Sequence, residues 1–136
     1  MPKLSWTAVS DVPPETEVVI MGSRLPLRRH RSIPAFMAAT LRIRRQLAGS
    51  EGLVGYALDA ELARKTFWTI SAWTGRDALR RFDREDPHRG ATRAIRPRML
   101  PSTFAFWTGT AADLPVPWDE VRRRLAAEAS GPAPAA

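Results

Sequence analysis

His88 is the residue whose type and position best suit chemistry, because it follows a helix break at Pro87 and is one of two histidines. A neutral imidazole can take a proton from an acidic phenol or give one to a carbonyl near neutral pH. It can equally ligate haem iron. From the residues alone a structural role stays open, in which His88 caps a helix or bonds a backbone carbonyl. His30 lies among arginines, and we expect it at the surface.

Aromatic side chains in and near segment 66–73 can hold a flat conjugated ligand, because aromatic rings stack on one another. Tyr56, the only tyrosine, offers a hydroxyl for a ligand oxygen. Arg81 can stabilise a developing enolate or phenolate. Packing in the core is the alternative role for the aromatic residues, and solvation is the alternative for the arginine. The candidate site comprises His88 and Arg81 as catalytic residues, with Trp73, Tyr56, Trp68 and Phe82 as substrate-binding residues.

Other chemistries are excluded or disfavoured by what the sequence lacks. It has no cysteine, which rules out disulfides, zinc-thiolate sites and a thiol nucleophile. The two histidines do not have a metal-ligand spacing, and neither a glycine-rich phosphate loop nor a serine nucleophile elbow occurs. We therefore expect no metal and no cofactor, with haem bound by His88 as the alternative.

The net charge of +7 comes almost entirely from arginine, since Lys3 and Lys65 are the only lysines among 21 basic residues. A strong positive charge is frequent in nucleic-acid-binding proteins. Here the arginines are spread along the chain, so we expect solvated helix faces, no nucleic-acid partner and, at most, small acidic ligands. We expect Asp83, Glu85 and Asp86 to pair with nearby arginines at the surface.

The two ends of the chain have a different composition from the middle. Residues 1–15 contain three prolines without a periodic pattern and predict an irregular lead-in, and residues 129–136 predict a disordered tail. Residues 16–128 are expected to form one domain. No apolar run reaches the roughly 18 residues of a membrane span, and the first residues lack the apolar core of a signal peptide. We expect a soluble cytoplasmic protein without a membrane partner.

Four segments have the composition of β-strands. Residues 17–25, 52–58, 65–73 and 102–108 are rich in apolar, aromatic and β-branched side chains. Gly55, inside the second segment, predicts a bulge or the close approach of another group.

Helical patterns separate these strands. Ser32 as N-cap and Gly49 as terminator predict a helix between them. A second helix is expected from residue 76, broken at Pro87 and continued to about residue 99. An amphipathic helix is expected over residues 118–125.

The resulting order is β-α-β-β-α-β with an added C-terminal helix, a ferredoxin-like α+β fold. Right-handed crossovers place both helices on one face of the sheet. Strand 65–73 carries bulky side chains on both faces, so the second face also needs cover. We expect a homodimer that packs through the sheet faces, because an exposed apolar face of this size would be a liability.

The motifs at 52–56 and 67–73, followed by Phe82 and Pro87-His88, resemble the dimeric α+β barrel superfamily. Over about residues 16–108, the sequence is similar to antibiotic biosynthesis monooxygenases and their bacterial relatives, including proteins similar to spheroidene monooxygenase. Trp73 and His88 match two positions that are landmarks of these proteins. The superfamily includes cofactor-free oxygenases, haem proteins and members without known activity, so its fold does not fix a reaction.

The resemblance implies a small, cofactor-independent, monooxygenase-like oxidoreductase acting on a flat aromatic or polyene molecule. His88 would be the general base, in a cavity between the sheet and the helices. Two alternatives stay open. One is a haem-binding protein of the same fold with His88 as axial ligand, and the other is a non-catalytic dimer that holds a hydrophobic small molecule.

Overall fold

A five-stranded antiparallel sheet forms the centre of the molecule, with strands in the order β1-β3-β4-β2-β5. The computed structural model describes residues 3–85 and 88–130. The strands are β1 (Lys3–Ala8), β2 (Glu17–Pro26), β3 (Leu53–Glu61), β4 (Thr66–Trp73) and β5 (Thr103–Thr110), and the helices are α1 (Ile33–Ala48), α2 (Arg76–Arg84), α3 (His88–Ile95) and α4 (Trp118–Ser130).

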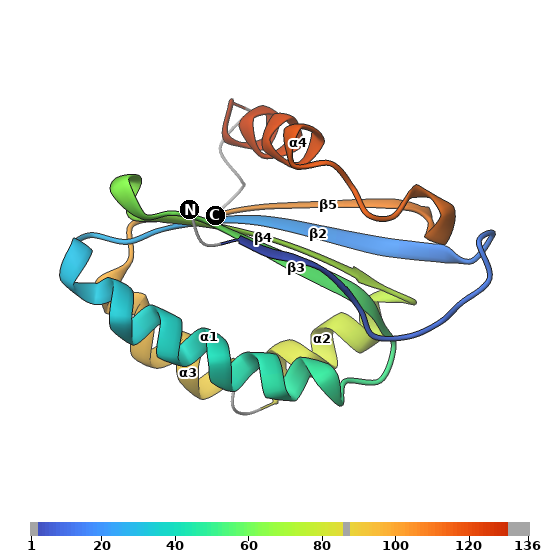
Figure 1. The fold of residues 1–136 in the computed structure, drawn as a ribbon, viewed down its shortest axis with the longest axis horizontal. Helices are drawn as coiled ribbons and strands as arrows, with labels where there is room; N and C mark the ends of the chain where they lie inside the picture. Colours follow the sequence, from blue (N-terminus) through green and yellow to red (C-terminus); the bar gives the residue numbers. More distant parts are fainter. Residues whose placement is uncertain (1–2, 86–87, 131–136) are drawn as a thin grey trace.

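The ferredoxin-like α+β arrangement predicted from the sequence is confirmed. Strand β2, whose apolar run predicted a central position, pairs antiparallel with both β4 and β5, so that Ile20 lies opposite Ala72 on one side and Trp107 on the other. Helices α1, α2 and α3 all lie on one face of the sheet (Figure 1). This layer of helices positions the candidate site.

The N-terminal lead-in is not wholly irregular, which corrects the expectation for residues 1–15. Lys3–Ala8 form β1, which pairs antiparallel with β3 at the sheet edge. Gly55 allows β1 to pack closely on β3, because the Trp6 ring occupies the space that a side chain at position 55 would need. The register of β3 against β4 also shifts between Leu53 and Gly55. The predicted bulge and close approach at this glycine are confirmed.

Helix α4 covers the face of the sheet that the sequence led us to expect bare. It packs across β2 and β5 on the side away from α1–α3 (Figure 1). Its Val121 is 0% exposed and its Leu125 is 2% exposed, and both join a cluster that includes Ile20 and Ala105. The premise of the homodimer is therefore wrong, because the chain hides much of this face itself, while the homodimer remains a prediction.

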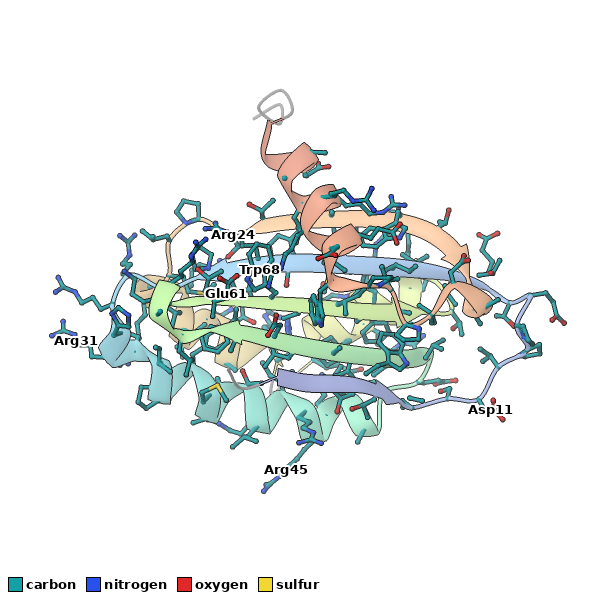
Figure 2. The ribbon with its side chains drawn as sticks, turned by 45° about the horizontal axis from the view of Figure 1, so that its top comes forward. Asp11, Arg24, Arg31, Arg45, Glu61 and Trp68 are labelled. Carbon is teal, nitrogen blue, oxygen red and sulfur yellow. The ribbon has the colours of Figure 1, made fainter. Side chains whose placement is uncertain are left out.

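A polar network joins α4 to the far part of the same face. Arg122 donates a hydrogen bond to Asp59 over 3.0 Å, lies 3.5 Å from a Glu61 oxygen, and covers the Trp68 ring with its guanidinium 4.8 Å from the ring centroid. The Trp68 indole N–H donates to Glu61 over 2.7 Å. Figure 2 shows Trp68 and Glu61 beside one another on this face. The helix is thus held by both apolar and charged contacts.

The end of α4 also revises the expected tail. The helix runs to Ser130, so residues 129 and 130 are helical, and residues 131–136 lie outside the described residues. None of the helices in the described part of the chain is long and apolar enough to cross a bilayer.

Candidate functional site

A cavity of about 1070 Å³ lies between the sheet and helices α1, α2 and α3. The strands explain why space is left there. On the helix-facing side, the middle of β2 and β4 carries small hydroxyl residues, Ser23, Thr69 and Ser71, where larger side chains would fill the gap. Phe36 on α1 and Trp73 on β4 also line the cavity. The result is an apolar space with a polar strip along its floor.

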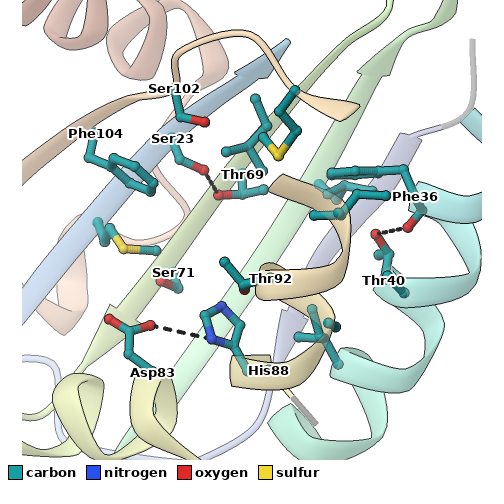
Figure 3. Close-up of a pocket in the computed structure, with 18 of the residues that line it drawn as sticks. Ser23, Phe36, Thr40, Thr69, Ser71, Asp83, His88, Thr92, Ser102 and Phe104 are labelled. Carbon is teal, nitrogen blue, oxygen red and sulfur yellow. Dashed lines mark hydrogen bonds and ion pairs between the residues drawn. The ribbon is translucent and has the colours of Figure 1, made fainter. Parts of the chain in front are cut away.

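The hydroxyls of the floor are partly bonded to one another. Ser23 and Thr69 face each other across the β2–β4 pair and share a hydrogen bond (Figure 3). The indole N–H of Trp73 donates to the Ser71 hydroxyl over 2.9 Å. Each hydroxyl has two lone pairs and a rotatable proton, so the strip can still bond oxygens of a ligand.

His88 is the first residue of α3 and enters the cavity from the break between α2 and α3. Its backbone N–H donates to the Gln46 side-chain oxygen over 2.9 Å, and the Gln46 amide nitrogen donates to the Phe82 carbonyl over 3.3 Å. One α1 side chain therefore fixes both sides of the break. The imidazole packs on Phe82 with ring centroids 4.6 Å apart, and its side chain is 24% exposed.

Asp83 faces the same imidazole. Its Oδ1 lies 3.8 Å from His88 Nδ1, which is beyond hydrogen-bond distance, and Figure 3 shows the two groups pointing toward each other. His88 Nδ1 is buried and has no hydrogen-bond partner in the described part of the chain. Burial raises the pKa of Asp83, and the nearby His88 partly opposes that rise. The carboxylate and the imidazole are therefore neighbours without a direct hydrogen bond.

Four of the predicted site residues lie around this cavity. Trp73 and Phe82 are buried with their ring centroids 5.4 Å apart, and Tyr56 and His88 line the same space. The sheet and the α2–α3 pair therefore bring residues 56, 73, 82 and 88 to one site.

Two predicted site residues lie elsewhere. Trp68 points to the α4 face, because it alternates with Thr69 along β4, and its indole is bonded to Glu61. Arg81 lies on the outer side of α2, exposed and 3.4 Å from Glu51, and it does not line the cavity. Neither residue can contact a ligand that lies beside His88.

Sequence reasoning did not predict the two polar residues that lie beside His88. Asp83 was expected at the surface, paired with arginines; its side chain is half-exposed at the edge of the cavity, but its neighbour is His88 and not an arginine. The adjacent Phe82 shares the apolar side of α2 with Leu79, and this apolar side was the available signal for which part of α2 faces inward. Gln46 gave no signal, because its partners lie about 40 residues further along the chain.

Among the residues that the structure describes, no group of three histidine, aspartate or glutamate side chains could hold a metal ion. The site's polar groups are instead one imidazole, one carboxylate and a strip of hydroxyls, with arginines lining the cavity as well. Such a set can move a proton and bind an oxygenated ligand.

Comparison with known proteins relates this chain to others by structure. No family model matches it, and no curated protein matches it in sequence. A conserved protein from Methanosarcina mazei superposes with a TM-score of 0.62 at 11% identity, covering 69% of this chain and 94% of that one.

Two further solved structures carry a stated activity. A cofactor-independent oxygenase, SnoaB from Streptomyces nogalater, gives a TM-score of 0.57 at 21% identity over 68% of this chain and 93% of that chain. An antibiotic biosynthesis monooxygenase superposes with a TM-score of 0.60 at 12% identity, covering 65% of this chain and 95% of that chain. At these identities the likeness is one of fold. The chain has the ferredoxin-like α+β fold of antibiotic biosynthesis monooxygenase structures.

Proposed function

We propose that this chain is a cofactor-independent oxidoreductase of the monooxygenase type, acting on a flat aromatic or polyene molecule with His88 as general base. The observation that carries the proposal is a buried, unpartnered imidazole nitrogen facing a carboxylate in a cavity walled by aromatic rings. The shared fold with a cofactor-independent oxygenase supports the reaction class.

The chemistry begins with a proton transfer. His88 takes a proton from a phenol, enol or activated CH₂ group of the substrate, and Asp83 stabilises the imidazolium that forms. The electron-rich carbanion then reduces O₂ directly. A ring CH₂ becomes C=O, the second oxygen atom leaves as water, and no external reductant is needed. The largely apolar walls keep bulk water from the intermediate.

The remaining cavity residues position the substrate. Phe82 lines the cavity in contact with the buried Trp73 ring, and this pair backs the wall beside which a flat ring system would lie. The hydroxyls of Ser23, Thr69 and Ser71 lie where they can bond ring oxygens. These contacts would hold the acidic C–H or O–H group beside His88.

Oxygen uptake with a panel of quinols and anthrone tests this function. Uptake above the uncatalysed rate is expected for the wild type, with a fall of about 10²-fold or more in His88→Ala. His30→Ala is the matched control, because His30 is exposed and bonds only the Ala63 carbonyl among the described residues. Absence of uptake with every substrate, or equal rates for His88→Ala and the wild type, would contradict the proposal.

Haem binding is the competing role for the same residue. Asp83 beside Nδ1 fits an axial imidazole, since a ligating histidine usually keeps its second nitrogen near an acceptor. A Soret band on adding haemin that disappears in His88→Ala but persists in His30→Ala would replace the cofactor-free proposal. Ligand binding that survives His88→Ala, without any oxygen uptake, would indicate a non-catalytic carrier instead.

A further inference from the structure

We infer that the ligand of this cavity carries a carboxylate, and that Arg89, Arg93 and Arg96 bind it. The inference rests on the proposed function for the flat ring system beside His88 and adds the substrate's charged end. Its basis is the sign of the charges around the cavity, their pairing, and their distance from the imidazole.

Charge around the cavity is strongly one-sided. Five arginines line it against a single carboxylate, that of Asp83. Three of the five, Arg89, Arg93 and Arg96, follow one another at i, i+4 and i+7 along α3 and the helical turn Arg96–Arg98. This spacing places them on one side of that segment. The Asp83 carboxylate lies against the imidazole, so it does not neutralise the row.

The three arginines of this row are exposed and form no ion pair within the described chain, a property that they share with arginines outside the cavity such as Arg31, Arg42 and Arg123. Elsewhere in the described chain, Arg64, Arg80, Arg81, Arg122 and Arg124 each form an ion pair with aspartate or glutamate. None of Arg89, Arg93 and Arg96 lies within ion-pair distance of a described carboxylate. Guanidinium groups bind carboxylates through two parallel hydrogen bonds, so the row suits an acidic ligand.

The opposite wall is apolar. Phe104 and Phe106 of β5 line the same cavity and are 45% and 48% exposed, unusually high for such large apolar side chains. Figure 3 shows Phe104 on β5 across from α3. A ligand whose aromatic rings pack against Phe104 and Phe106, and whose carboxylate points to α3, would fit both walls.

The length of α3 sets the size of the ligand. His88 and Arg96 are eight residues apart, which at about 1.5 Å per residue corresponds to about 12 Å along the helix. Three fused rings with a terminal carboxylate span a comparable length. Such a molecule can place one ring at His88 while its acid reaches Arg93 or Arg96.

Calorimetric titration with anthraquinone-2-carboxylate and its neutral carboxamide tests the inference. Neither quinone consumes oxygen, so binding is measured apart from the reaction. The wild type is expected to prefer the carboxylate, and Arg89→Gln/Arg93→Gln/Arg96→Gln should weaken that ligand about tenfold while leaving the carboxamide unchanged. The control, Arg31→Gln/Arg42→Gln/Arg123→Gln, removes the same charge from exposed residues that do not line the cavity.

A second measurement on the wild type does not depend on a variant's folding. Raising the sodium chloride concentration from 50 to 500 mM should weaken binding of the carboxylate and leave binding of the carboxamide unchanged. Equal affinity for both ligands, no binding of either, or equal losses in the two triple variants would overturn the inference. The oxygenase proposal would fail in a different way: oxygen uptake would be absent while the protein still bound the carboxylate in preference to the carboxamide.

Discussion

The two faces of the sheet differ in how closely they are packed and in whether their polar groups are bonded within the chain. On the α4 face, Trp68, Glu61, Asp59 and Arg122 bond or stack on one another beneath a fully packed helix. On the opposite face, the strands leave a cavity in which the His88 Nδ1 faces a carboxylate without bonding it. The first face is filled by contacts within the chain, and the second leaves space in which a ligand can bind.

Each strand serves both faces, because side chains alternate along it. In β4, Trp68, Ile70 and Ala72 belong to the packed face, while Thr69, Ser71 and Trp73 line the cavity. Substitutions on the two faces should therefore separate stability from ligand binding, although neighbouring residues are involved.

Leu125→Ala should have the largest effect on stability. Leu125 is 2% exposed, and its truncation leaves a void under α4 that costs about 2–4 kcal/mol of unfolding free energy. Urea unfolding measures the loss, and ligand affinity should be unchanged. Met21→Ala on the cavity face is the comparison, expected to cost about 1 kcal/mol because Met21 already borders open space. Equal losses at the two positions would contradict the difference between the faces.

Asp59→Asn removes one of the two β3 carboxylates that pair with Arg122 of α4, and leaves the Glu61 carboxylate in place. Asp59 is buried and bonded to Arg122, whose side chain can reach water, so the expected loss is about 1–2 kcal/mol. Urea unfolding at low and high salt would show it. A loss below about 0.3 kcal/mol would contradict a stabilising role for the Asp59–Arg122 pair.

Asp83→Asn should have opposite effects on activity and stability. Because burial raises the pKa of Asp83, the folded state keeps this proton to a higher pH than the unfolded state. Ionisation therefore lowers wild-type stability as the pH rises above the ordinary value of 3.8. Relative to the wild type, Asp83→Asn should be more stable at pH 7 than at pH 3.5, with slower oxygen uptake. Thermal unfolding across this pH range measures the trend, and a stability difference independent of pH would contradict it.

Arg81→Gln should have the smallest effect. Arg81 pairs with Glu51 on the exposed side of α2, where such pairs contribute about 0–1 kcal/mol. Oxygen uptake and ligand affinity should match the wild type. A drop of tenfold or more in uptake, with folding intact, would return Arg81 to the site and revise the position of the cavity.

The ferredoxin-like core could be predicted because its signals are local. Each signal lies within a few residues of the element that it predicts. Examples are the apolar run of β2, Ser32 at the N-cap of α1 and the break after α2. Strand β1 was missed because a six-residue edge segment has little pattern of its own. Helix α4 was predicted, but an amphipathic helix after a proline-containing link does not show which face it will cover.

The site was predictable only in part, for a geometric reason. Alternation along β4 already separated Trp68 from Trp73, so both could not line one cavity. The pairing of Asp83 with His88 depends on the angle between α2 and α3, which Gln46 fixes from a distant helix. Long-range hydrogen bonds of this kind leave no periodic trace in a sequence.

Binding of a flat ligand beside His88 can be followed directly by histidine NMR, because the chain has only two histidines. Labelled imidazoles of wild-type protein would be followed while anthraquinone-2-carboxylate is added. The His88 resonances are expected to shift until the site is saturated, while the exposed His30 resonances stay in place; His30→Ala assigns the two sets of resonances. Unchanged His88 resonances at saturating ligand, or equal shifts at both histidines, would contradict binding beside His88.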